Sequence, residues 1–72
     1  MKPEIGKKYY IYYRPLRFAK DNDLAYEGPG VYSGDSRIEY DGEILYWFTD
    51  LVSENGNDDM GWFSSEDILK EI

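Results

Sequence analysis

The chain has 72 residues, with 8 Lys or Arg against 15 Asp or Glu, and its net charge is −7. A chain this short buries one core, so we expect residues 1–72 to form a single domain. Because it holds 0 Cys and 0 His, it excludes a disulfide framework, a Cys/His zinc site, a thiol nucleophile and any mechanism that needs an imidazole.

The charge is divided along the chain. Residues 1–20 hold six basic residues and one acidic residue, a net charge of +5, whereas residues 21–72 hold two basic and fourteen acidic residues, a net charge of −12. Either a basic first strand pairs with acidic strands across a sheet, or the surface is polarised and steers a charged partner.

The first predicted strand is residues 8–14, KYYIYYR, which is dense in aromatic and β-branched side chains. On a strand, Tyr9, Ile11 and Tyr13 share one face, and Tyr10, Tyr12 and Arg14 share the other. One of the two tyrosine pairs, Tyr10 with Tyr12 or Tyr9 with Tyr13, is therefore expected to be partly exposed. Pro15 ends the pairing, residues 16–18 continue the strand, and residues 19–27 form a polar loop.

The middle of the chain predicts turns and short strands. Gly28-Pro29-Gly30 predicts a tight turn, and residues 31–33 predict a short strand that Gly34 and Asp35 close. Residues 37–40 and 43–48 are two alternating runs joined by Asp41-Gly42. This dipeptide is favoured in the two-residue type I′ turn of a hairpin.

The last third predicts a second hairpin and a short turn. Asn55-Gly56, within residues 50–59, indicates a turn or a long hairpin loop, and residues 60–63 form a strand. Ser64 followed by Asp67 is close to a capping box, and it predicts a short 3₁₀ or α turn near residues 64–69. Residues 68–72 fit either a helix or a strand.

Five short strands at close spacing predict a mainly β fold, a small antiparallel five-stranded barrel or curved sheet. An α+β sheet with one C-terminal helix is the alternative.

The stretch GWFSSEDI, residues 61–68, carries a family resemblance. Its residues Gly61, Trp62, Phe63, Ser65 and Ile68 fit the Gly-Trp-aliphatic-Pro-Ser-Asn-Tyr-Val stretch of Src-homology-3-like (SH3-like) small β-barrels, and Tyr46-Trp47 fall where that family has its Trp pair. Residues 43–72 thus resemble the second half of such a barrel, which implies a 3₁₀ turn before the last strand. Ser64 and Asp67 stand where the family has its groove Pro and groove Tyr, so polyproline-II binding is not implied.

The segments GKKYY, GPGVYSG and GWFSSEDI also give the chain the general look of small proteins encoded by phages and prophages.

The sequence does not indicate an enzyme, a cofactor or a metal. The adjacent acids Asp58-Asp59 and Glu66-Asp67 alternate across a strand, so neither pair forms a cooperating acid and base. Residues 21–23 and 54–59 offer oxygen ligands for calcium, but they lack the spacing of a calcium-binding loop.

Membrane contact is not expected either. The longest apolar run, residues 44–48, is far short of the ~20 residues of a membrane span. The first residues lack the apolar segment of a signal peptide, so we expect a cytoplasmic protein.

Protein binding is the function that the aromatic content favours. Aromatic residues make up 18% of the chain, and Tyr and Trp are enriched in protein interfaces. Alternation places Trp47 opposite Tyr46 and Phe48, and Trp62 opposite Phe63, so part of each run is exposed. The predicted partner-binding anchors are Tyr10, Tyr12, Trp47 and Trp62, with an acidic rim around them. Such a non-enzymatic module could be a phage-encoded modulator or inhibitor of a host protein.

Two nucleic-acid hypotheses remain open. In the first, the chain is an acidic mimic that blocks a DNA- or RNA-binding groove, through a surface made of Asp35, Glu39, Asp41, Glu43, Asp50, Glu54, Asp58 and Asp59. In the second, which the charge of −12 opposes, nucleic acid binds directly to the basic strand. There bases would stack on Tyr10 and Tyr12, and the phosphates would be contacted by Lys7, Lys8, Arg14 and Arg17.

We expect a monomer, or a weak homodimer if residues 8–14 form an uncovered edge strand. Such an edge would be protected by Lys8, Arg14 and Pro15.

Overall fold

The computed structural model describes residues 1–14 and 25–72. The predicted strand continuation over residues 16–18, most of the predicted loop over residues 19–27 and the calcium candidate over residues 21–23 lie outside the described residues. So do Pro15 and Arg17.

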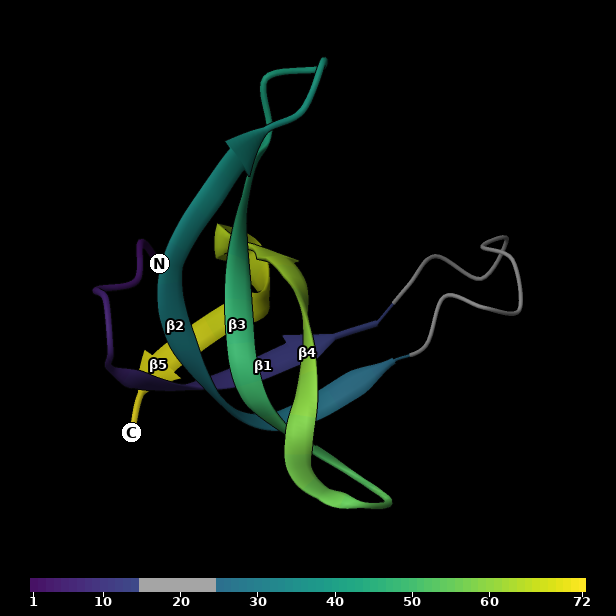
Figure 1. The fold of residues 1–72 in the computed structure, drawn as a ribbon. Coiled ribbons are helices and arrows are strands. Elements are labelled where there is room, and N and C mark those ends of the chain that lie inside the picture. The colour runs from purple at the N-terminus through teal and green to yellow at the C-terminus, as the bar shows by residue number, and fades with distance from the viewer. Residues whose placement is uncertain (15–24) are drawn as a thin grey trace.

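Five antiparallel strands form one curved sheet that does not close into a barrel (Figure 1). The strand order is β4-β3-β2-β1-β5, and a 3₁₀ turn, η1, precedes the last strand. The mainly β prediction is confirmed, and residues 68–71 are a strand rather than a helix. The bounds are β1 Lys8–Tyr13, β2 Tyr26–Ile38, β3 Ile44–Ser53, β4 Gly56–Ser64, η1 Ser65–Asp67 and β5 Ile68–Glu71.

The long strand β2 joins the two halves of the sheet. Its first part pairs with β1, and its second part pairs with β3 from Val31 onward. The register with β3 shifts between Tyr32 and Ser36, where the strand bends. Residues 31–33 and Gly34 are therefore inside one continuous strand, not a short strand closed by a turn.

The predicted turn at Gly28-Pro29-Gly30 was wrong, because these residues lie within β2 and Pro29 pairs with Tyr10 of β1. A proline is tolerated here because the pairing of β2 with β3 begins only at Val31. Gly30 serves close packing rather than a turn. A Cβ atom on it would lie 2.7 Å from Ile11 Cδ1 and 2.7 Å from Leu51 Cδ2, inside the core.

The first hairpin exists, but its predicted type I′ turn was wrong. Gly42 N–H donates to the Glu39 carbonyl, and Glu39 N–H donates to the Glu43 carbonyl, so three residues form the loop. Gly42 has a φ of +90°, whereas Asp41 has no positive φ, and a type I′ turn needs both to be positive. The Asp41 carboxylate instead accepts the N–H of Glu43 at 3.0 Å, which stabilises the longer loop.

The second hairpin has a tight turn, the first of the two alternatives that the sequence left open, and not a long loop. β3 continues to Ser53 and pairs with Gly56, so only two residues separate β3 from β4. The predicted strand over residues 60–63 is the end of the longer strand β4.

The core lies on the concave side of the sheet and is dominated by aromatic rings. Tyr9 and Phe48 meet edge to face, with ring centroids 6.2 Å apart, and the Tyr9 hydroxyl accepts the N–H of Glu4 at 2.7 Å. Each strand contributes to this core: the buried residues are Tyr9, Ile11, Tyr32, Tyr46, Phe48, Leu51, Phe63 and Ile68.

The prediction that residues 8–14 could be an edge strand was wrong, because β1 lies between β2 and β5. The edge strands are β4 and β5. On β4, the N–H of Met60 donates to the Asp59 carboxylate at 2.9 Å, and the N–H of Ser64 donates to the Asp67 carboxylate at 3.1 Å. The contact between Ser64 and Asp67 confirms the predicted capping interaction at η1.

Candidate functional site

The four predicted anchors lie in two separate places on the outer face of the sheet. Tyr10 and Tyr12 lie on β1, on the side opposite the buried Tyr9 and Ile11. Trp47 lies on β3 and Trp62 on β4. In the described parts of the chain no aromatic pair joins the tyrosines to the tryptophans.

Contacts within the molecule already occupy the tyrosine site. The Tyr10 hydroxyl donates to Glu27 Oε2, and Arg14 Nη2 lies 2.9 Å from Glu27 Oε1. The Arg14 guanidinium stacks on the Tyr12 ring, 4.4 Å from its centroid. The hydrogen bond to Glu27 raises the pKa of Tyr10 above its usual value, so this face is a linked polar network.

The tryptophan site brings two aromatic rings into direct contact. Trp47 and Trp62 are direct partners in the β3–β4 register, and their rings lie 4.9 Å apart at an interplanar angle of 53°. The guanidinium of Arg37, on β2, lies 4.8 Å from the Trp62 ring centroid and pairs with Glu39 at 2.9 Å. We call Trp47, Trp62 and Arg37 the Trp platform.

Alternation along the strands explains why the platform faces outward. Tyr46, Phe48 and Phe63 are buried, whereas Trp47 and Trp62 are half-buried. The sequence predicted this pattern for both tryptophans. It missed Arg37, because the stack on Trp62 depends on how β2, β3 and β4 align.

The predicted acidic residues separate into groups. Glu39, Asp41 and Glu43 surround the β2–β3 turn, while Glu54, Asp58 and Asp59 surround the β3–β4 turn. Figure 1 places these turns at opposite ends of β3. Asp35 and Asp50 lie on β2 and β3 between them. All eight are exposed except Glu39, which is half-buried.

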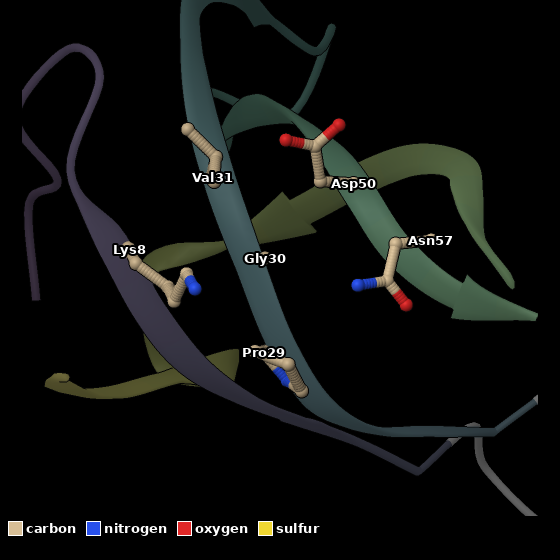
Figure 2. A pocket seen from close by; sticks show the side chains of 6 residues that line it. All are labelled: Lys8, Pro29, Gly30, Val31, Asp50 and Asn57. Atoms are coloured by element: carbon tan, nitrogen blue, oxygen red, sulfur yellow. The ribbon is translucent and has the colours of Figure 1, made fainter.

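A polar hollow of about 290 Å³ lies where β2 bends between β1 and β3 (Figure 2). Lys8 of β1, Asp50 of β3 and Asn57 of β4 extend around it, and residues 29–31 of β2 form its floor. Asp50 is the one non-glycine residue with positive φ among residues 1–14 and 25–72, at +59°. It lies where the β3–β4 register shifts between Phe48 and Leu51.

The sequence assigned Lys8 and Asp50 to different surfaces. It placed Lys8 on a basic strand and Asp50 on an acidic surface, and it considered Asn57 only within residues 54–59. The signal that joins them is the strand register. Val31 pairs with both Lys8 and Thr49, so Asp50 lies one residue beyond the strand position across from Lys8.

Charge pairing around β1 agrees in part with the first of the two charge interpretations. Arg14, directly after β1, pairs with Glu27 of β2, and Lys7, directly before β1, lies 2.7 Å from Glu4 and 3.7 Å from Glu71. Lys8, within β1, belongs to none of the ion pairs of the described residues. The Lys7–Glu4 contact lowers the pKa of Glu4 and raises the pKa of Lys7. Part of the basic N-terminal segment is thus neutralised locally.

Across residues 1–14 and 25–72, acidic side chains do not gather in groups of three or more that could hold a metal ion. Within the same residues, no helix is long and apolar enough to cross a membrane. Comparison with family models, curated proteins and solved structures found no match to the chain.

Proposed function

We propose that this chain is a non-enzymatic protein-binding module that contacts its partner through the Trp platform. The observation that carries this proposal is the pairing of Trp47 and Trp62 on the outer face of the sheet, with Arg37 stacked on Trp62. Trp, Tyr and Arg are the residues most enriched among interface side chains that contribute most of the binding energy, and the platform combines two Trp with one Arg.

The platform is a better anchor than the tyrosine site. The Tyr10 hydroxyl donates to Glu27, and Arg14 stacks on Tyr12, which remains 42% exposed, so the two tyrosine rings are not joined to each other as the tryptophan rings are. The tryptophan rings are half-buried, so they are held in place and still present an apolar surface. Tyr10 and Tyr12 then belong to the edge of the interface, where contacts contribute less.

The 3₁₀ turn before β5 is the feature that the resemblance to SH3-like barrels implies, although the sheet itself is open. Fold alone does not assign function. The resemblance to small phage-encoded proteins makes a host protein the partner to test first, with this chain acting as its modulator or inhibitor.

The nucleic-acid mimic has weaker support. Two of the acidic groups lie at opposite ends of β3, a strand of 10 residues that spans about 30 Å at the usual rise per residue. Duplex DNA carries one charge per ~1.7 Å of its axis. The acidic groups are therefore much sparser than the phosphates they would replace.

Affinity capture with matched variants tests the proposal. The immobilised chain is compared with Trp62→Ala, Trp47→Ala and the control Tyr40→Ala, whose fully exposed ring lies in the β2–β3 turn. We expect one host protein to be captured by the parent chain and by Tyr40→Ala, and to be lost with both tryptophan variants. NMR spectra establish that each variant is folded.

Capture that survives in both folded tryptophan variants contradicts the proposal. If capture instead falls steeply with salt and DNA competes for the captured protein, the mimic replaces it, because exposed charges are screened over ~8 Å at physiological ionic strength.

A further inference from the structure

We propose that the polar hollow binds a small zwitterion of amino-acid size. The ammonium group of the ligand lies against the Asp50 carboxylate, its carboxylate lies against the Lys8 ammonium, and Asn57 hydrogen-bonds to it from the third side. This site is separate from the Trp platform, and it does not depend on the proposed protein partner.

The charged side chains around the hollow form no ion pair among residues 1–14 and 25–72. Within the described parts of the chain, the ion pairs are Lys7 with Glu4 and Glu71, Arg14 with Glu27, and Arg37 with Glu39. Neither Lys8 nor Asp50 belongs to one, although both border the same hollow (Figure 2). Lys8 and Asp50 therefore form no ion pair with each other, and a ligand in the hollow between them can contact both.

The backbone of Asp50 adopts a conformation that is unfavourable for most residues other than glycine. A φ of +59° is the left-handed region, which glycine adopts without strain and other residues adopt at a cost. The register shift beside Asp50 is an irregularity of the kind that redirects a side chain. Asp50 lines the hollow. A glycine at this position would adopt the same backbone conformation without strain, but it would bring no charge to the hollow.

The floor of the hollow is held in place by close packing. Residues 29–31 belong to the bend of β2, and Gly30 packs against Ile11 and Leu51 with no room for a Cβ atom. At Val31, which pairs with both β1 and β3, these two strands lie on either side of the floor, about 9.6 Å apart by two strand spacings. Lys8 and Asp50 therefore approach the ligand from opposite sides, and this arrangement selects two separated charges rather than a single ion.

An NMR titration tests the site. The uniformly ¹⁵N-labelled chain is titrated at fixed ionic strength with glycine, β-alanine, 4-aminobutanoate and 5-aminopentanoate, which separate the two charges stepwise. Ethylammonium and propionate carry one charge each and serve as controls. We expect saturable chemical-shift changes at the amides of Lys8, Asp50 and Asn57, with the highest affinity for one member of the series. The affinity for the single ions should be at least about tenfold lower, which is the loss expected when one charged contact is removed.

Variants locate the binding. Asp50→Asn and Lys8→Met are each expected to lower the affinity for the most tightly bound zwitterion about tenfold. Two control variants are expected to leave this affinity unchanged. Asp58→Asn changes an acid that lies beside Asn57 but outside the hollow. Trp62→Ala removes the proposed anchor for the protein partner. Asp50→Gly is expected to lose binding and keep the fold, since glycine adopts the same φ without strain.

Shifts that rise linearly with concentration, that are equal for zwitterions and single ions, or that persist in Asp50→Gly overturn the proposal. The titration does not depend on protein capture. If Trp62→Ala loses capture and still binds the zwitterion, both proposals are supported. The protein-binding proposal fails in the capture experiment, and the zwitterion proposal fails in the titration.

Discussion

The hydroxyl of Tyr26 donates a hydrogen bond to the carbonyl of Pro29, 2.6 Å away and three residues further along β2. The same hydroxyl accepts the N–H of Val52 on β3 at 3.0 Å. Since the pairing of β2 with β3 begins only at Val31, this one oxygen links the two strands where the ladder between them is absent.

Tyr26→Phe is therefore expected to destabilise the fold by about 1–2 kcal/mol, the net value of two hydrogen bonds. The ring itself is retained, so its packing against Phe63 is kept. Urea denaturation measures the loss, and hydrogen exchange should show faster exchange of the Val52 amide. An unchanged Val52 exchange rate would show that the hydroxyl does not hold the strands together.

Gly30→Ala is expected to destabilise the fold by about 1–3 kcal/mol, because the added methyl group overpacks the core. The new atom would lie 2.7 Å from both Ile11 Cδ1 and Leu51 Cδ2. The matched control is Gly61→Ala on β4, where the nearest atom is Phe63 Cε2 at 3.5 Å, an ordinary contact. Thermal unfolding of the two variants should separate them clearly, and equal midpoints would be evidence against close packing at Gly30.

Tyr10 is expected to ionise at higher pH than an ordinary tyrosine, whose pKa is about 10. The hydrogen bond to Glu27 is the main cause, and it favours the neutral phenol in the folded state. A raised folded-state pKa gives stability that is complete below the unfolded pKa and is lost as pH rises through the folded value.

Carbon-13 NMR of the tyrosine ring measures this titration. In Glu27→Ala the pKa of Tyr10 should fall. Glu71→Ala removes a carboxylate that pairs with Lys7 instead, and it should leave the pKa of Tyr10 unchanged. A Tyr10 titration that ignores the Glu27 substitution would rule out the hydrogen bond as the cause.

Arg37 and Trp62 are expected to be coupled by about 0.5–1 kcal/mol, the usual value for an exposed cation–π pair. A double-mutant cycle with Arg37→Ala and Trp62→Ala isolates this energy from the other contacts of each residue. Denaturant unfolding of the four proteins supplies the measurement. Strict additivity of the two single changes would mean that the stacked geometry contributes no stability.

Strand periodicity made much of this structure predictable. The pattern KYYIYYR predicted which tyrosines of β1 share a face, and the alternation around Trp47 and Trp62 predicted that neighbouring aromatic residues face opposite sides of the sheet. These inferences depend only on the two-residue repeat of a strand. They needed no knowledge of neighbouring strands.

The errors came from positions where contacts distant in sequence decide the conformation. Gly28-Pro29-Gly30 has the composition of a turn, yet β1 pairs with it and the core requires Gly30 to be small. The polar hollow escaped prediction for the same reason, since Lys8, Asp50 and Asn57 meet only through the register of β1 to β4. Composition identifies residue types, and register determines which of them become neighbours.

The carboxylates of Asp59 and Asp67 occupy backbone donors on the edge strand β4. Counted by composition, they are only two of fifteen acids. Because of where they lie, these two carboxylates accept hydrogen bonds from backbone N–H groups of an edge strand. Another chain that paired with this edge would need the same N–H groups. Resistance to fibre formation would then be a property of two particular acceptors, and a change of either to alanine would matter more than the loss of the same charge elsewhere.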